Sequence, residues 1–194
     1  MLADLILKNR SYRRFHQDVP VSLDILRELV GLARLSASAR NLQPLRYILC
    51  AAPETSAAIF DTLAWAGYLK DWPGPVEGER PAAYIVVLHD TTLGGQAFIG
   101  VDHGLAVQNI LLGAVERGLG GCIIASVQRE RLRQILAIPE RYEILVVLAL
   151  GKPKEAVVIE PVGPDGDIKY WRDAEGVHHV PKRSLDELIV GERG

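Results

Sequence analysis

The sequence Asn9-Arg10-Ser11-Tyr12-Arg13-Arg14-Phe15 places three guanidinium groups and a hydroxyl directly after the short apolar run Leu2 to Leu7. Arginine carries a permanent charge and a planar set of donors that match phosphate oxygens. Arg10 and Arg13 are three residues apart, so at a helical end they lie on the same side. The stretch therefore predicts a site for a dianionic group. The alternative is that these cations only complement the dipole at the end of a first helix, by roughly 0.3–1 kcal/mol each.

A second stretch, Ser36-Ala37-Ser38-Ala39-Arg40-Asn41-Leu42-Gln43-Pro44, follows the next predicted helix and leads into a strand. Together the two stretches resemble the nitroreductase family of flavin enzymes. Members carry an N-terminal motif close to Arg-Arg-Ser-x-Arg-x-Phe and then a Pro-Ser-x-x-Asn-x-Gln-Pro loop, in this order and at about this separation. The chain departs from these motifs at Asn9, Ala37 and Leu45, where many members have arginine, proline and an aromatic residue. The first departure weakens one phosphate contact, and the others touch the edge of the flavin.

Helical and strand patterns alternate along the chain. Ser22 is an N-cap residue for a helix over 23–35, where apolar residues recur with helical period. A long helix over 95–117 is apolar nearly all round and stops at Gly118, so we expect it to be buried on more than one side. The remaining expected elements are strands at 46–52, 82–89, 121–126 and 144–150, helices at 54–68 and 129–136, and a hairpin formed by 168–172 and 176–180.

The glycine-rich segment 118–122 closes a helix and opens a strand. Rossmann glycines do the opposite, so the segment does not predict a dinucleotide site. In the resemblance it matches the family's Gly-Leu-Gly segment, and the strand after it ends at Ala125 and Ser126. There the family places backbone amides against the flavin ring, where a fixed donor stabilises the negative charge of reduced flavin. A plain strand end is the alternative for these two residues.

The family segment Asp-x-Gly-x-Ala-x-Gln-Asn appears here at residues 102–109 of the long helix, which lies at the centre of the family's dimer. Polar side chains at positions 102, 103, 108 and 109 would need buried partners inside an apolar helix. We therefore expect structural hydrogen bonds there and not catalysis. His103 in particular is expected to be a satisfied core or interface residue, because no second titrating group is placed beside it.

Near the C-terminus, Pro181-Lys182-Arg183-Ser184 resembles the family's closing basic motif, whose cations reach the flavin phosphate. Ser184 replaces the usual proline. Because the match could be shifted by one residue, either Lys182 or Arg183 could make the closer contact. The alternative is a solvated basic pair on the surface.

The resemblance implies an α+β flavin-reductase fold, with a central mixed sheet wrapped by helices, in an intertwined homodimer with FMN at the subunit interface. It implies one domain over residues 1–194, with 154–194 as an extended C-terminal segment. A variable region is expected to form a lid over the flavin, with Trp65, Tyr68, Lys70, Asp71, Trp72 and Glu77. The residues expected to bind the cofactor are Arg10, Ser11, Arg13, Ala37, Ser38, Asn41, Gln43, Ala125, Ser126, Lys182 and Arg183.

The activity implied is that of an FMN-dependent oxidoreductase. It would pass hydride from NADH or NADPH through flavin N5 to a small acceptor such as a nitroaromatic, quinone or enone, in two half-reactions. No side chain is expected to be catalytic, since the flavin carries the chemistry and the protein orients it. Two alternatives are a specialised flavin enzyme of the same fold, acting in reductive dehalogenation or flavin fragmentation, and a non-catalytic FMN-binding redox protein. The sequence does not determine the acceptor or the choice of NADH or NADPH.

The composition sets further expectations for the chain, which has 194 residues, 48% of them hydrophobic. A net charge of −2 and a pI near 6.2 argue against a nucleic-acid surface. Cys50 and Cys122 lie in separate apolar runs, so we expect buried free thiols and a reducing, cytoplasmic location. Polar residues interrupt the apolar run 105–115, so no membrane span is expected. The adjacent His178 and His179 would point to opposite faces of a strand and could not share a metal.

Overall fold

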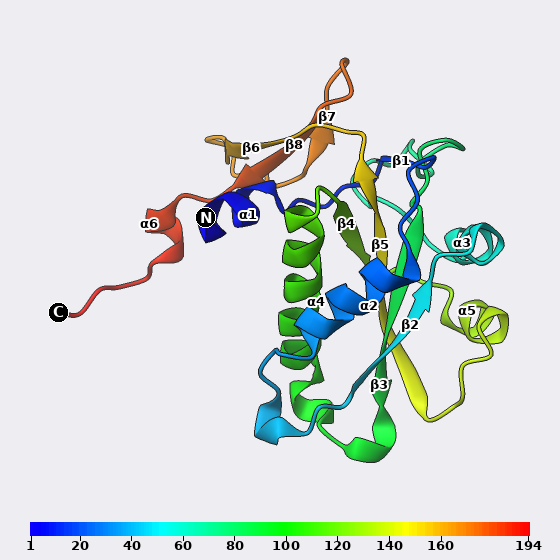
Figure 1. Ribbon diagram of the computed structural model, residues 1–194. Coiled ribbons are helices and arrows are strands. Elements are labelled where there is room, and N and C mark those ends of the chain that lie inside the picture. Colours follow the sequence, from blue (N-terminus) through cyan, green and yellow to red (C-terminus); the bar gives the residue numbers. More distant parts are fainter.

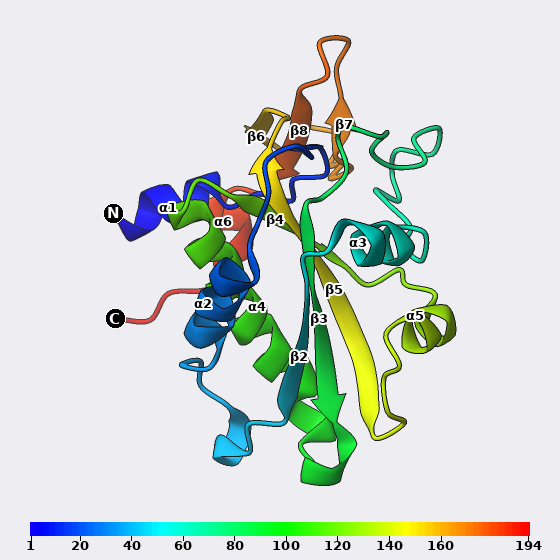
Figure 2. The same cartoon turned by 45° about the vertical axis from the view of Figure 1, so that its right-hand side comes forward.

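The computed structural model describes residues 1–194 and contains a five-stranded sheet with helices on both faces (Figures 1 and 2). The strands lie in the order β1-β5-β3-β2, and β4 also pairs with β5. All ladders of this sheet are antiparallel. The resemblance implies a mixed sheet. In this sheet the parallel pairing is one isolated bridge, between Ser11 and Gly121. The strands are β1 (Phe15–His16), β2 (Leu45–Cys50), β3 (Ala83–Asp90), β4 (Gly120–Ile124) and β5 (Tyr142–Pro153).

Strand β3 lies in the middle of the sheet and is buried along its whole length. Its side chains alternate between the two faces, as the pleat requires. Ile85 and Val87 belong to one hydrophobic cluster, and Tyr84 and Val86 belong to the other. A fully buried aliphatic side chain contributes roughly 1.5–3 kcal/mol to stability. The apolar run of β3 thus joins two cores that lie on opposite faces of one sheet.

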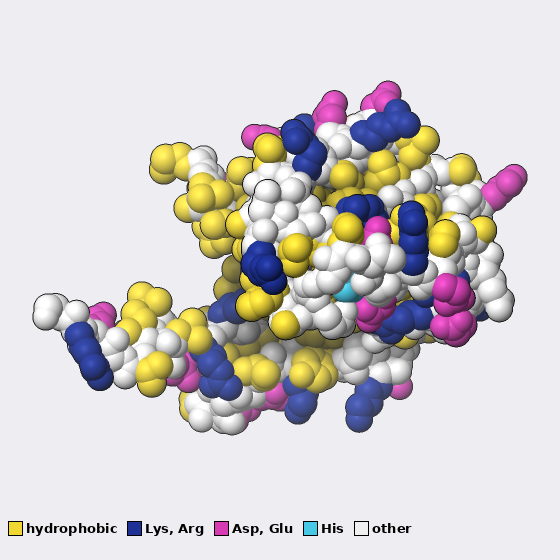
Figure 3. Space-filling model, turned by 90° about the horizontal axis from the view of Figure 1, so that it is seen from below, with side chains coloured by type: hydrophobic (Ala, Val, Ile, Leu, Met, Phe, Trp, Pro, Cys, Tyr) yellow, Lys and Arg dark blue, Asp and Glu magenta, His cyan; other side chains and the backbone are white.

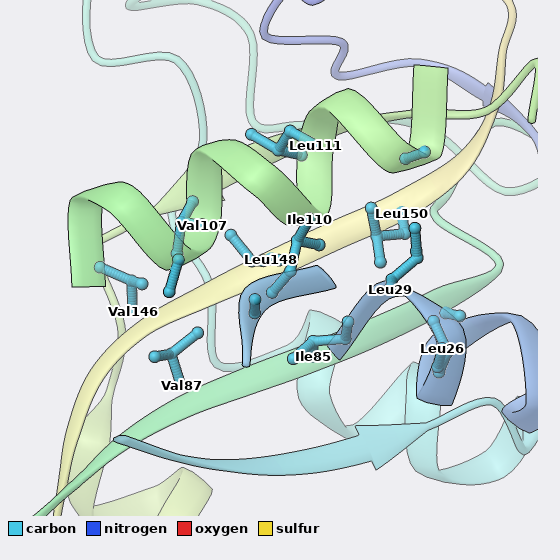
Figure 4. Packing of buried hydrophobic residues seen from close by; sticks show 14 of the residues in the cluster. Leu26, Leu29, Ile85, Val87, Val107, Ile110, Leu111, Val146, Leu148 and Leu150 are labelled. Atoms are coloured by element: carbon cyan, nitrogen blue, oxygen red, sulfur yellow. The ribbon is translucent and has the colours of Figure 1, made fainter. Parts of the chain in front are cut away.

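The helices divide between these two cores. On one face α2 (Leu23–Ala33) and α4 (Ile99–Glu116) pack on β3 and β5, as the labelled side chains in Figure 4 show. On the other face lie α3 (Pro53–Phe60) and α5 (Arg129–Ile135). Helix α2 begins at the expected N-cap, since the Ser22 hydroxyl accepts a hydrogen bond from the Ile25 amide. The α+β class and the helical covering of the sheet are therefore confirmed.

Helix α4 crosses the molecule as its longest helix (Figure 1). By length and composition the stretch Gln96–Glu116 could cross a membrane, with a mean hydropathy of 1.4, but 44% of its most apolar window is buried inside the protein. At Gly113 a Cβ atom would lie 2.3 Å from Leu32 Cδ1 of α2, so glycine allows these helices to approach closely. The burial and the close packing are those of a core helix.

The predicted helix over 54–68 is wrong in its second half. Helix α3 ends at Phe60, and the chain then leaves the helical path to pair with the segment after β4. Leu63 forms a bridge with Val127, and the Ala64 amide donates to the Ser126 carbonyl. These tertiary hydrogen bonds replace the helical ones, although the local composition favours a helix. The other predicted elements are confirmed, with ends shifted by a few residues.

The C-terminal part of the chain forms a second, three-stranded sheet beside the first (Figure 2). In it β8 (His178–Lys182) pairs in parallel with β6 (Val157–Pro161) and antiparallel with β7 (Trp171–Arg172), which confirms the expected hairpin. This sheet packs near the N-terminal helix α1 (Leu2–Lys8) (Figure 1). After β8 the short helix α6 (Leu185–Leu188) leads into an arm that points away from the body.

An ion-pair cluster joins the N-terminal arm, the 61–81 loop and the end of β5. Arg14 donates two hydrogen bonds to Glu79, at 2.6 and 2.7 Å, and Lys154 Nζ lies 3.0 Å from the same carboxylate. Hydrogen bonds from Arg14, and then from Lys154, lower the pKa of the Glu79 carboxyl to about 2. The cluster therefore ties three distant segments together through one partly buried carboxylate.

We expect Glu79→Gln to lower the free energy of unfolding by about 1–3 kcal/mol at neutral pH, the range for hydrogen bonds to charged groups. The folded-state pKa of about 2 lies below the ordinary 4.5, so this contribution is complete above about pH 4.5 and is lost as the pH falls toward 2. Urea unfolding between pH 3 and 7 would show the difference between wild type and variant shrinking with acidity. Exposed Glu140→Gln is the matched control, and a pH-independent difference would contradict the prediction.

Candidate functional site

A cationic hollow of about 200 Å³ lies between the N-terminal arm and β8. Its three charged residues, Arg10, Arg13 and Lys182, are all positive, and no carboxylate lines it. Arg10 donates through Nη2 to the Ile6 carbonyl at 2.8 Å, but its Nε is buried without a hydrogen-bond partner. A hollow with this charge and with unused donors suits an anionic group. The complete lining is Asn9, Arg10, Ser11, Arg13, Tyr170, His178, Val180 and Lys182.

Two rings of the C-terminal sheet region hold the guanidinium of Arg13. It lies 4.7 Å from the centre of the Tyr170 ring, and its Nη1 is 3.1 Å from Nε2 of His178. Burial, and then the charges of Arg13 and Arg172, lower the pKa of His178 to about 4. His178 is therefore neutral near pH 7, and its Nε2 accepts the hydrogen bond from Arg13. Its proton is then on Nδ1, which is buried without a partner.

The carboxylate of Glu155, in the segment between β5 and β6, holds the backbone that presents Arg13. It accepts hydrogen bonds from the amides of Arg13 and Arg14. Its second oxygen accepts a 2.9 Å hydrogen bond from Arg172 of β7. The Glu155 side chain is fully buried, so the four residues form one closed network. The network fixes the direction in which Arg13 leaves the backbone.

A second cavity, of about 230 Å³, adjoins the hollow at Arg13 and Tyr170, which line both. Ala125 and Ser126 lie at its wall, directly after β4, and their amides donate to no backbone carbonyl. Trp65 is buried there with an indole N–H that has no partner. We call the hollow and this strand-end cavity together the trough. The other residues of the strand-end cavity are Ala64, Ala66, Gly67, Cys122, Ile123 and Ile124.

Cys122 does not offer a nucleophile to the trough. Both cysteines, Cys50 and Cys122, are free and buried, as expected from the sequence. Burial raises the pKa of the Cys122 thiol, and it raises that of Cys50 to about 11. A thiol that stays protonated is a poor nucleophile. The trough therefore offers charges, donors and apolar walls, but no activated side chain.

The loop 36–44 lies elsewhere, beside the first turn of α4. Ser38 donates a 2.6 Å hydrogen bond to Asp102 and accepts one from the Gln43 amide, and the Ala39 amide donates to the same carboxylate at 3.0 Å. Arg40, Asn41 and Gln43 all have positive φ angles, which is a strained conformation for residues other than glycine. Asp102 thus holds a loop that would not keep this shape alone. Ala37, Ser38 and Gln43 line a third cavity of about 270 Å³, while Asn41 does not.

The other polar groups of α4 also have partners, which confirms their structural interpretation. Asn109 donates to the Ser36 hydroxyl at 2.9 Å, and the Nδ1 atom of His103 lies 2.8 Å from the Ile99 carbonyl. Gln108 accepts a hydrogen bond from the Asn9 side chain. Helix α4 therefore connects the loop 36–44 near one end with the N-terminal arm farther along.

The structure places the predicted residues in two groups. Arg10, Ser11, Arg13, Lys182, Ala125 and Ser126 line the trough, whereas the 37–43 residues lie at the opposite end of α4. Of the two C-terminal cations, Lys182 lines the hollow and Arg183 does not. The guanidinium of Arg183 lies 3.4 Å from the Glu187 carboxylate.

Tyr170 and His178 were missed as site residues. A signal for His178 exists, because the period of two along β8 puts His178, Val180 and Lys182 on one face. All three line the hollow. Tyr170 had no comparable signal, since its contacts with Tyr68 and Arg13 join segments far apart in the chain.

The chain is thus an α+β protein with a cationic hollow beside the end of a buried strand. The model of the nitroreductase family matches residues 6–152, and the chain belongs to this family. The C-terminal sheet and the arm lie outside the matched residues. A Thermus thermophilus protein named NADH dehydrogenase is 28% identical over 175 residues, with 77% of this chain and 85% of the relative covered.

Solved structures agree on the fold. A nitroreductase family protein from Streptococcus pneumoniae superposes with a TM-score of 0.71 over the whole of both chains, at 16% identity. An FMN-dependent nitroreductase from Clostridium difficile superposes with a TM-score of 0.63 at 22% identity, over 79% of this chain and 88% of that one. At these identities the likeness is one of fold.

We expect Glu155→Gln to lower the free energy of unfolding by about 3 kcal/mol, because it removes the charge from a buried ion pair and leaves Arg172 without its partner. Urea denaturation of the purified variant measures this loss. Glu175→Gln makes the same charge change at an exposed position between β7 and β8 and should stay within about 0.5 kcal/mol of wild type. Equal stabilities of the two variants would show that Glu155 does not hold the network.

Proposed function

We propose that the protein is an FMN-dependent oxidoreductase that transfers reducing equivalents from NADH or NADPH to a small acceptor. The observation that carries this proposal is the trough. One end has three cations and no carboxylate, and the other has two free backbone amides beside apolar walls. A phosphate tail and a flat, mostly apolar ring with polar edges need these two environments side by side. Family membership and the names of the relatives favour the same activity.

The residues present fit this cofactor. Arg10, Arg13 and Lys182 would hold the phosphate, and the unpartnered Nε of Arg10 supplies a donor that no group of the chain uses. The amides of Ala125 and Ser126 would face the ring, where fixed donors favour added negative charge. When bound, FMN would supply the redox chemistry, taking hydride from NAD(P)H and passing it to a nitroaromatic, quinone or enone. The side chains therefore bind and orient, and the proton that accompanies each hydride to the acceptor would come from solvent.

The apolar wall of the strand-end cavity would exclude water from the ring. Trp65 packs against Phe60, with ring centres 5.7 Å apart, and against Gly74, where a Cβ atom would meet the indole at 2.7 Å. Tyr68 of the same loop packs on Tyr170 in a tilted arrangement, with ring centres 4.9 Å apart. The contact between Tyr68 and Tyr170 joins the 61–81 loop to the hairpin. These contacts support the assignment of this loop as a lid.

We further propose a homodimer in which the loop 37–43 completes the trough of the partner subunit. In one chain, this loop and the hollow lie at opposite ends of α4, which is about 27 Å long at 1.5 Å per residue over 18 residues. Exposed apolar residues lie on α1, on α4 and on the projecting C-terminal arm (Figure 3). Patches of this kind mark protein interfaces. They include Leu2, Leu7, Val101, Leu105, Leu185, Leu188 and Val190.

The activity is tested by the visible spectrum of the purified protein, with the released chromophore identified by mass. We expect bound FMN, and we expect NADH or NADPH to bleach it rapidly without oxygen, with colour restored by a quinone or nitroaromatic. Bound flavin that bleaches only slowly would favour a non-catalytic flavin protein. A protein that stays colourless after incubation with FMN would overturn the proposal.

The shared site is tested by subunit complementation. We expect Arg10→Ala/Arg13→Ala and Asn41→Ala/Gln43→Ala each to lose tight FMN binding, because each removes one half of every site. A mixed dimer of the two variants contains one site with both halves intact, so it should bind about half the FMN of wild type. Arg27→Ala, on the exposed surface of α2, is the control and should bind normally. No recovery in a verified mixed dimer would show that the loop does not complete the partner's site.

A further inference from the structure

A third region with the features of a binding site lies on the outer side of α3, away from the trough. It is a cavity of about 380 Å³ between α3, the start of β3 and residues 77–82. Figure 2 shows α3 beside β3, with this loop above it. No residue lines both this cavity and the trough. Its lining is Gln17, Pro53, Glu54, Ser56, Ala57, Phe60, Glu77, Arg80, Pro81, Ala82 and Tyr84.

Three polar atoms of this lining are buried and have no hydrogen-bond partner. They are the Tyr84 hydroxyl, the Ser56 hydroxyl and Nε of Arg80. Tyr84 is fully buried and Ser56 is 7% exposed. Buried polar groups are nearly always paired, and leaving one unpaired is unfavourable. Three such groups belong to residues that line one cavity, and a ligand with acceptor atoms would satisfy them.

The N-terminal end of α3 adds unpaired donors at the same place. Its N-cap is Ala52, which has no side chain able to cap the helix. The amides of Glu54 and Thr55 donate to no backbone carbonyl. A helix N-terminus carries a partial positive charge and favours an anion. Pro53 and Glu54 of this first turn line the cavity that Tyr84 and Ser56 also line.

The remaining walls define the shape and the charge of the ligand. Phe60, Ala57 and Pro81 are apolar, and the Arg80 guanidinium lies 4.3 Å from the centre of the Phe60 ring. Glu77 pairs with Arg80 at 3.0 Å, and the side chain of Glu77 is 73% exposed, against 31% for Arg80. Glu54 and Glu77, which also line the cavity, repel negative charge, so they disfavour a dianion more than a monoanion.

We propose that this cavity binds a small organic monocarboxylate with an apolar body. The carboxylate accepts hydrogen bonds from Arg80, Ser56 and Tyr84, and the apolar body lies against Phe60. The site is independent of the flavin, since it shares no residue with the trough.

Benzoate is a suitable probe, with benzamide as its neutral isostere and isophthalate as its dianion. We expect millimolar benzoate to raise the Tm of the protein in a concentration-dependent manner, as a ligand of the native state must. Benzamide and isophthalate should have little effect, and the benzoate shift should be the same with and without saturating FMN. Absence of a shift with benzoate would overturn the proposal. A shift that FMN abolishes would also overturn it, because benzoate would then bind in the trough.

Two variants locate the site. Arg80→Gln and Tyr84→Phe should each weaken benzoate binding about tenfold or more, since each removes a donor to a charged group. Without benzoate, Tyr84→Phe should be as stable as wild type or more stable, because it removes an unsatisfied hydroxyl. Tyr142→Phe, which lies outside the cavity, is the matched control and should bind benzoate normally. Unchanged affinity in both cavity variants, or a marked loss of unliganded stability in Tyr84→Phe, would overturn the proposal.

Discussion

The buried carboxylate of Glu155 is the contact on which the cationic end of the trough depends. It accepts hydrogen bonds from two consecutive amides of the N-terminal arm and from Arg172 of the C-terminal sheet, so it joins the first 15 residues to a segment more than 140 residues away. Without this acceptor the amides of Arg13 and Arg14 would be buried and unpaired. Arg13 then lies between Tyr170 and His178, where its side chain is held on two sides.

A consequence is that the part of the chain outside the matched family residues supplies much of the hollow. Residues 6–152 match the family model, yet Tyr170, His178 and Lys182 all lie beyond them. The N-terminal arginines and the strand end after β4 come from the common part of the family. The C-terminal sheet closes the space around them. Differences among relatives in this segment would therefore change how tightly the anionic group is held while the sheet stays the same.

Helix α4 imposes the second constraint. Its polar residues bind the loop 36–44 through Asp102 and Asn109, while its far end leads by a short turn into β4 beside the N-terminal arm. A rigid helix between the two groups keeps them apart within one chain. The same helix is apolar and partly exposed on another side, at Val101 and Leu105. The dimer that we propose, with a second copy of the chain packed along α4, would account both for the separation of the two groups and for the exposed apolar face.

Much of the fold could be predicted from local patterns. The doubly buried β3, the N-cap at Ser22 and the helix stop at Gly118, whose φ is +70°, all follow from residue type and period. The predicted helix over 54–68 failed because hydrogen bonds to the segment after β4 competed with the helical ones. Lys182 and Arg183 could not be separated in the sequence, because the match to the closing basic motif could be shifted by one residue. In the structure β8 ends at Lys182, and Arg183 pairs with Glu187.

The sequence by itself determined the order of most elements and the two stretches, 9–15 and 36–44, whose resemblance to the nitroreductase motifs implied the α+β class. These are properties of short segments, where hydrophobic period, capping residues and charge act over a few positions. Only the tertiary structure decided that Tyr170 and His178 meet Arg13, that Glu155 orders the arm, and that residues with three unpaired donors line one cavity beside α3. Such placements depend on which distant segments pack together. Local sequence does not specify these contacts, because the burial of the whole chain determines which segments meet.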